Sequence, residues 1–157
     1  MNEYLLEARE ELKRLEHIIY VSLKYSRTVD VLNNALTRLV SIYDLILEAF
    51  LEKAKLEGLI GALPKSPAFR ATKLAEMYPD DLEMQKYLVF YSFLKNVLKS
   101  PHRKREEYRR HVTLIVDLDK TTVEIDIDSL MNCERLMHQF FSYAWRTIEG
   151  KPVDEEV

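Results

Sequence analysis

Apolar residues recur every three or four positions along the first third of the chain, a spacing that predicts amphipathic helices. Residues 2–57 contain neither Gly nor Pro. The first apolar stripe comprises Leu5, Ala8, Leu12, Leu15, Ile19 and Ser22, and the second comprises Val29, Leu32, Leu36, Leu39, Tyr43, Ile46 and Phe50. The alternation of three- and four-residue intervals between apolar positions reverses its order at residues 25–28. Thr28 is a suitable N-cap for a new helix there. We therefore expect two long antiparallel helices rather than one.

The second of these helices is expected to lie centrally, because it carries apolar residues outside its stripe at Val40, Leu47 and Leu51. After it, residues 58–67 hold two glycines and two prolines, which predicts a loop. A short helix is expected to follow over residues 68–78, because Pro79 disfavours helical geometry in the residue before it.

Two further helices are predicted in the second half of the chain. Asp80–Glu83 has the pattern of a capping box and opens a helix that ends before residues 100–101. The apolar face of this helix comprises Met84, Tyr87, Tyr91, Leu94 and Leu98. The final helix is expected to start at a cap on Asp128 or Ser129 and to end at Gly150. Its apolar face comprises Leu130, Cys133, Met137, Phe140, Ala144 and Ile148.

Between these two helices the period changes to the two-residue alternation of β-strands. Even positions are apolar in residues 112–119 and odd positions in residues 123–128. Both apolar faces point inward only if paired residue numbers sum to an odd value, because side chains alternate along a strand. A turn over residues 119–122 meets this condition. The resulting pairs are Leu118 with Val123, Val116 with Ile125, and Leu114 with Ile127.

Together these elements predict a mainly α fold, an up-and-down bundle of four to five helices with one β-hairpin, at about residues 112–128, inserted before the last helix. Residues 1–150 are expected to form a single helical domain, and residues 151–157 a disordered acidic tail. A two-stranded hairpin is marginal in water, so it must pack on the bundle or pair with another chain. We therefore expect a homodimer.

Composition narrows the class of protein. The chain has 157 residues and a net charge of -3, which argues against wholesale wrapping of nucleic acid and in favour of a local patch for any anion. Cys133 is the only cysteine, which is typical of a reducing cytoplasm. The acidic start of the chain does not resemble a signal peptide, and no apolar run is long enough to span a membrane. Scarce glutamine beside abundant Glu, Lys and Arg is typical of a thermophilic source.

No motif of high catalytic specificity occurs, and no cofactor is expected. The chain lacks a glycine-rich phosphate loop, a nucleophile elbow and the ligand spacing of a structural metal site. The acidic face of the hairpin is a secondary candidate for a cation, because Asp117 would lie opposite Glu124 in the predicted register. Its members are Asp117, Asp119, Glu124, Asp126 and Asp128. Pairing with neighbouring Arg and Lys is the commoner arrangement, so we expect no metal.

Residues 102–111, which we call the basic segment, are the leading candidate site because they carry five cations against two carboxylates. Arg105 is suited to holding a phosphate, and His111 to transferring a proton near neutral pH. Further phosphate or nucleic-acid contacts are expected from Arg103, Lys104, Tyr108, Arg109 and Arg110. A structural interpretation stays open, because cations at the end of a helix also compensate its dipole and the neighbouring acidic strands.

In three features the chain resembles the HEPN family of small helical domains, named for nucleotide binding in higher eukaryotes and prokaryotes. The first is the pair of long antiparallel helices, the second of which opens with residues 28–36. The second is the loop at residues 65–67, which leads into a short helix and then a longer one. The third is the spacing of Arg105 and His111, which fits the family's Arg-x4-6-His motif. The resemblance covers roughly residues 2–111.

This resemblance implies a dimer with Arg105 and His111 at the dimer cleft, and RNA or a nucleotide as ligand. Any enzyme of this kind would be at most a metal-independent ribonuclease, in which Arg105 stabilises the phosphorane and His111 transfers the proton. The family motif usually lies on a helix, whereas His111 here runs into strand-like residues 112–114. Two hypotheses therefore stay open: an HEPN-like dimer that binds RNA or a nucleotide, and a non-enzymatic homodimer with a structural or protein-interaction role.

Overall fold

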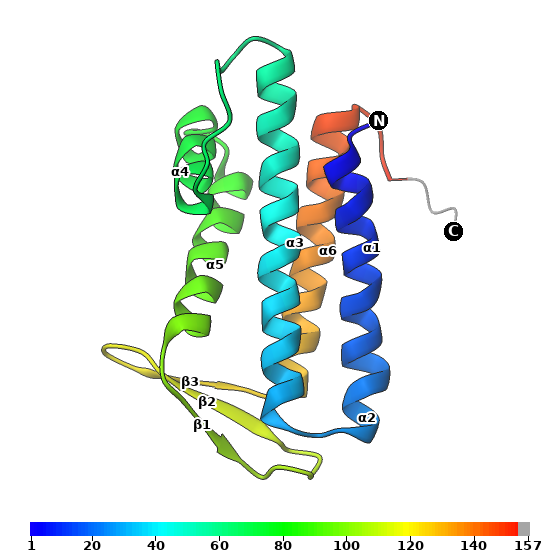
Figure 1. The fold of residues 1–157 in the computed structure, drawn as a ribbon, viewed down its shortest axis with the longest axis vertical. Helices are drawn as coiled ribbons and strands as arrows, with labels where there is room; N and C mark the ends of the chain where they lie inside the picture. Colours follow the sequence, from blue (N-terminus) through cyan, green and yellow to red (C-terminus); the bar gives the residue numbers. More distant parts are fainter. Residues whose placement is uncertain (154–157) are drawn as a thin grey trace.

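The computed structural model describes residues 1–153, whose helices form an up-and-down bundle (Figure 1). The helices are α1 (Glu3–His17), the π-helical turn η1 (Ile18–Ser22), α2 (Leu23–Tyr25), α3 (Val29–Leu56), α4 (Pro67–Met77), α5 (Leu82–Lys99) and α6 (Ile127–Glu149). The predicted mainly α fold, with β-structure inserted before the last helix, is confirmed.

The break between the first two long helices lies at residues 26–28, where the change of period predicts it. The Thr28 side chain caps α3 by accepting a hydrogen bond of 3.3 Å from the Val31 amide. The end of the first stripe differs from the prediction, because Leu23 is buried and Ser22 is not. The π-helical turn accommodates an extra residue, which moves the buried face along by one position.

Helix α3 lies at the centre of the bundle, in contact with α1, α4, α5 and α6 (Figure 1). The expected additional apolar positions Leu47 and Leu51 are both fully buried. Aromatic rings fill the contact with α5 and α6: the Tyr43 centroid lies 5.3 Å from that of Tyr91 and 4.9 Å from that of Phe140. Tilted aromatic pairs at such distances add to the stabilisation that burial provides.

The later long helices start near their predicted caps. Asp81, rather than Asp80, caps α5 by accepting a backbone N–H bond of 3.1 Å. Helix α6 starts earlier than predicted, because Asp126 forms a reciprocal capping box with Ser129. The helix ends as expected at Gly150, whose φ of 75° is the left-handed conformation that favours glycine.

Three strands, rather than two, precede α6. They are β1 (His102–Arg105), β2 (Thr113–Asp117) and β3 (Thr122–Ile125), an antiparallel sheet of order β1-β2-β3 across one end of the bundle (Figure 1). The predicted hairpin corresponds to β2 and β3, but its register is shifted: Val116 pairs with Val123, and Leu114 with Ile125. Paired numbers still sum to an odd value, so the apolar face still packs on the bundle. The shift follows from the early start of α6, which removes Ile127 from the strand.

The described part of the chain ends shortly after α6. Lys151–Val153 follow α6 as irregular backbone, and the rest of the predicted disordered tail lies outside the described residues.

Cys133 is half-buried, and burial raises the pKa of its thiol to about 11, so the thiol stays protonated at neutral pH. Over residues 1–153, none of the helices combines the length and apolarity needed to cross a membrane.

Candidate functional site

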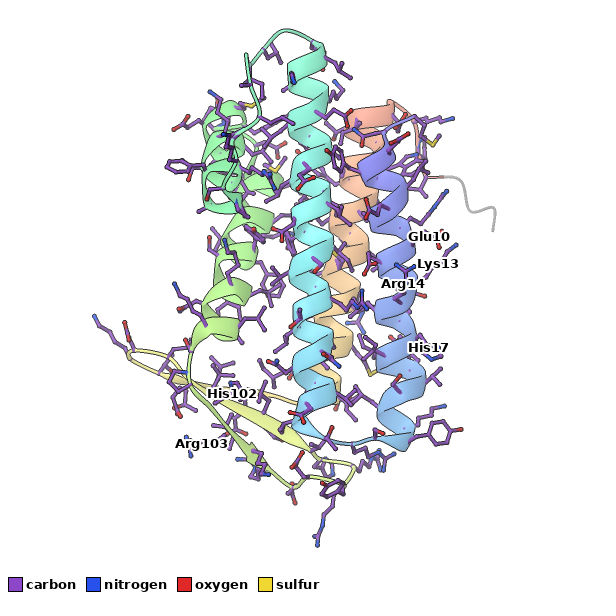
Figure 2. The ribbon with its side chains drawn as sticks, in the orientation of Figure 1. Glu10, Lys13, Arg14, His17, His102 and Arg103 are labelled. Atoms are coloured by element: carbon purple, nitrogen blue, oxygen red, sulfur yellow. The ribbon has the colours of Figure 1, made fainter. Side chains whose placement is uncertain are left out.

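The first half of the basic segment forms strand β1, where Figure 2 labels His102 and Arg103 at the sheet end of the bundle. Arg103 donates two hydrogen bonds, of 2.8 and 3.0 Å, to Asp117 on β2. Arg105 forms an ion pair with Glu124 on β3. These hydrogen bonds hold the pKa values of both carboxylates below their ordinary range. The expected like-charge pair of Asp117 with Glu124 is absent, because in the observed register the two carboxylates are not opposite each other.

The outer face of the sheet is therefore an ion-paired surface. Lys104 is also paired, with its Nζ 3.2 Å from a Glu107 oxygen. Among residues 1–153, no group of three or more His, Cys, Asp or Glu is arranged to hold a metal ion. Within the same residues, neither Arg109 nor Arg110 makes an ion pair, and Tyr108 is 77% exposed. The cations without carboxylate partners thus lie in the second half of the basic segment.

That second half is a loop, residues 106–112, which is held against the start of α3. The Tyr108 amide donates a 2.7 Å hydrogen bond to the Arg27 carbonyl, and the Glu107 carboxylate accepts one of 2.9 Å from the Val29 amide. Tyr108 has a φ of 68°, a left-handed conformation that costs roughly 1–2 kcal/mol for a residue with a side chain. Such strained positions cluster at functional sites, where the surrounding contacts maintain them.

A cleft of about 280 Å³, which we call the basal cleft, lies between this loop, the η1–α2 turn and the start of α6. Its polar lining comprises Lys24, Arg27, Arg110, His111, Asp126 and Asp128. Its other lining residues are Ile19, Tyr20, Leu23, Ile127 and Met131. Three fixed cations face two carboxylates, and the N-terminal end of the α6 dipole adds positive potential. The cleft is therefore locally cationic in a chain of net charge -3.

Arg27 carries the clearest chemical signal in the basal cleft. Its Nε atom is buried and has no hydrogen-bond partner within residues 1–153. A buried donor without an acceptor costs about 1–3 kcal/mol, and more when the group is charged. An anion bound in the cleft would supply the missing acceptor once the side chain turns this donor, which has no accessible surface in the present conformation, toward the cleft.

The two carboxylates of the cleft differ in their availability. Asp126 accepts hydrogen bonds of 2.8 and 2.9 Å from the amide and hydroxyl of Ser129, so its charge is engaged in capping α6. Asp128 is exposed in the first turn of the same helix. Asp128 is therefore the more accessible of the two acceptors for hydroxyl or amino groups of a ligand.

The structure brings two of the seven predicted site residues, Arg110 and His111, together in the basal cleft. The other five are not among its lining residues: Arg103, Lys104, Arg105, Tyr108 and Arg109. Lys24 and Arg27 also line the cleft but were not predicted. Lys24 directly precedes the change of period at residues 25–28 and Arg27 lies within it, so a cation at that break is the one signal that could have identified them.

Comparisons of the chain with protein-family models, with curated proteins and with solved structures give no match. We therefore infer a function from the geometry and charge of the basal cleft.

Proposed function

We propose that the protein binds RNA or a nucleotide through a phosphate group held in the basal cleft. The observation that carries this proposal is the cationic lining of the basal cleft, where Lys24, Arg27 and Arg110 meet and Arg27 retains a buried Nε without an acceptor within the described residues. Guanidinium groups bind phosphate oxygens through paired, charge-assisted hydrogen bonds. His111 adds a further donor at the same cleft.

The remaining lining favours a nucleotide unit over a bare phosphate ion. Tyr20 is 42% exposed and lines the cleft, and aromatic rings provide stacking surfaces for unpaired bases. Asp128 supplies an acceptor for a ribose hydroxyl or a base amino group. The volume of about 280 Å³ lies just below the range of small-molecule sites, about 300–1,000 Å³, which favours at most one nucleotide unit per cleft.

The HEPN-like interpretation remains part of this proposal. In its catalytic form, His111 transfers the proton and Arg105 stabilises the phosphorane, without a metal ion. Arg105 is engaged with Glu124, and the Arg105 of a second protomer would be engaged in the same way, so this form requires the pair to open. Binding at the basal cleft does not depend on that step.

The binding proposal is tested by fluorescence anisotropy with a short fluorescent single-stranded RNA at several salt concentrations. We expect Arg27→Gln and Arg110→Gln each to weaken binding about tenfold or more, as the loss of a charge-assisted hydrogen bond predicts. The slope of affinity against salt should also decrease, because each variant removes one phosphate contact.

Lys120→Gln is the matched control, since it removes the same charge from an exposed position in the β2–β3 turn, outside the cleft. It should bind RNA like the wild type. Equal losses in all three variants would indicate a general charge effect, and wild-type affinity in the two cleft variants would exclude the cleft as the site.

A structural homodimer is the second candidate, and one observation favours it. Leu82, Val89 and Phe93 on α5 are 83%, 70% and 36% exposed, and their spacing places them on one face of the helix. Contiguous exposed apolar side chains commonly mark a surface that a protein partner covers. We therefore propose this face of α5 as the contact between two copies of the chain.

A further inference from the structure

A second hollow, which we call the lateral groove, lies along the side of the bundle between α5 and α6 and shares no residue with the basal cleft. Its volume is about 670 Å³. Helix α6 contributes Arg135, His138, Gln139, Ser142 and Arg146. Arg135, Gln139, Ser142 and Arg146 follow one another at intervals of four, three and four, with His138 beside Gln139, so the five residues form one polar stripe along the helix.

The two arginines of the stripe have no carboxylate partner within residues 1–153. Arg135 donates to the Asn132 side-chain oxygen at 3.1 Å, and no ion pair or side-chain hydrogen bond engages Arg146. The two are eleven positions apart, which is about 16 Å at 1.5 Å per residue of helix. The groove therefore presents a cation at each end of its α6 wall, with polar side chains between them.

The carboxylates near the groove are already engaged. Glu83 accepts a 2.5 Å hydrogen bond from the Tyr87 hydroxyl. His138 Nε2 lies 3.0 Å from a Glu16 oxygen on α1, closer than the 3.8 Å to Glu134 on its own helix. None of these three acids pairs with an arginine of the stripe. Glu83 is the one carboxylate of the described lining and keeps its charge, so two arginines against one carboxylate leave the groove with a net positive charge.

The lining favours a polypeptide over a nucleic acid strand. Tyr87 is fully buried, so the His138 imidazole, 46% exposed, is the one ring of the described lining on which a base could stack, which is little stacking surface for a strand of several bases. Gln139 and Ser142 offer donors and acceptors of the kind that match backbone amides. Pro152 and Val153 also line the groove, which therefore already accommodates irregular polypeptide.

We propose that the lateral groove binds an extended acidic peptide segment of a partner protein, with carboxylates on Arg135 and Arg146. An extended peptide rises about 3.3 Å per residue, so about five residues cover the distance between the two arginines. Because side chains alternate along an extended chain, carboxylates about four or six positions apart in the partner lie on one side and reach both guanidinium groups. This interaction is independent of the phosphate site in the basal cleft.

The test is fluorescence anisotropy of the full-length protein with a labelled peptide of alternating Glu and Ala. We expect saturable binding, weakened about tenfold or more in the Arg135→Gln/Arg146→Gln variant, because two charge-assisted contacts are lost. Lys55→Gln/Lys120→Gln is the control, since it removes the same charge from exposed positions elsewhere. Both variants replace exposed side chains, and equal thermal unfolding temperatures would establish that both fold.

Three results would overturn the proposal. The first is equal affinity of the two double variants for the glutamate peptide. The second is tighter binding of a single-stranded RNA of matched charge, lost in the Arg135→Gln/Arg146→Gln variant, which would assign the groove to nucleic acid. The third concerns Asp154, Glu155 and Glu156, which lie outside the described residues. If replacing these three by Ser tightens peptide binding about tenfold or more, the chain's own acidic residues are the occupant.

Discussion

At the scale of single residues, Arg27 joins the fold to the proposed site. Its carbonyl accepts the Tyr108 amide that positions the loop of residues 106–112, while its buried Nε has no acceptor within the described residues. The backbone of this residue thus serves the structure, and its side chain is available to a ligand. A substitution that changes the side chain alone separates the two roles.

We predict that Arg27→Met leaves the free energy of unfolding unchanged or raises it by up to about 1 kcal/mol, while RNA binding is lost. The reason is that removing a buried, unpaired donor relieves a desolvation cost. Urea unfolding followed by circular dichroism measures the change. A loss of more than about 2 kcal/mol, typical of broken packing, would show that the side chain is structural instead.

The residues of the basal cleft could be predicted from the sequence only in part. Arg110 and His111 lie in a run of cations, and this local charge was enough to identify them as candidate site residues. Lys24 and Arg27 meet them only because the β1–β2 loop packs on the start of α3, a long-range contact that no local period encodes. The ion pairs of Arg103 and Arg105 likewise depend on a strand pairing that was not foreseen.

At the scale of elements, the sheet is the part most dependent on charge. Strand β1 is exposed at all four positions, and two of its cations bind carboxylates of β2 and β3. The two-residue alternation of β2 and β3 made their hairpin predictable, whereas the uniformly polar β1 shows no alternation at all. Its pairing follows from charge complementarity across the strands, which hydrophobic patterns do not report.

We predict that the sheet loosens in acid. Hydrogen bonds from Arg103 and Arg105 lower the pKa values of Asp117 and Glu124 below the ordinary 3.8 and 4.5. A depressed carboxyl pKa contributes stability above the ordinary value, and this contribution is lost as the pH falls through the pKa of the folded state. Hydrogen exchange of the β2 amides, followed from neutral pH to below 3.8, should therefore show falling protection.

The matched variant Asp117→Asn/Glu124→Gln isolates this effect from other acids such as Asp44, whose pKa burial raises and whose contribution has the opposite sign. Protection in the variant should change less with pH over the same range. A pH profile identical to that of the wild type would mean that the ion pairs do not hold the sheet.

At the scale of the whole molecule, hydrophobic spacing predicts where the long helices lie in the chain. The short connections between them predict that they pack up and down in one bundle. The basal cleft lies at the sheet end, and the N-terminus lies at the other end, beside the end of α6 (Figure 1). A tag at the N-terminus is thus remote from the cleft. Hydrophobic spacing could not predict what covers the exposed apolar face of α5, because the pattern within one chain does not identify the chain's partners.

We predict a dimer of the 18.6 kDa chain in size-exclusion chromatography with light scattering. Val89→Glu should yield a monomer, because it places a charge in the apolar contact proposed for α5. Leu56→Glu is the control, since Leu56 is 81% exposed on α3 and lies outside that face. A monomeric wild type, or equal dissociation in both variants, would rule out the α5 contact.

The most direct test of the phosphate site is a nuclear magnetic resonance titration of the isotope-labelled protein with a ribonucleoside monophosphate. We predict saturable shifts centred on the Arg27 Nε–H and on the amides of Lys24, Arg110 and His111. The Arg27 signal should move furthest, because that donor gains its acceptor. Shifts confined to Arg103 and Arg105 on β1, or no saturable shift at all, would contradict the assignment of the basal cleft.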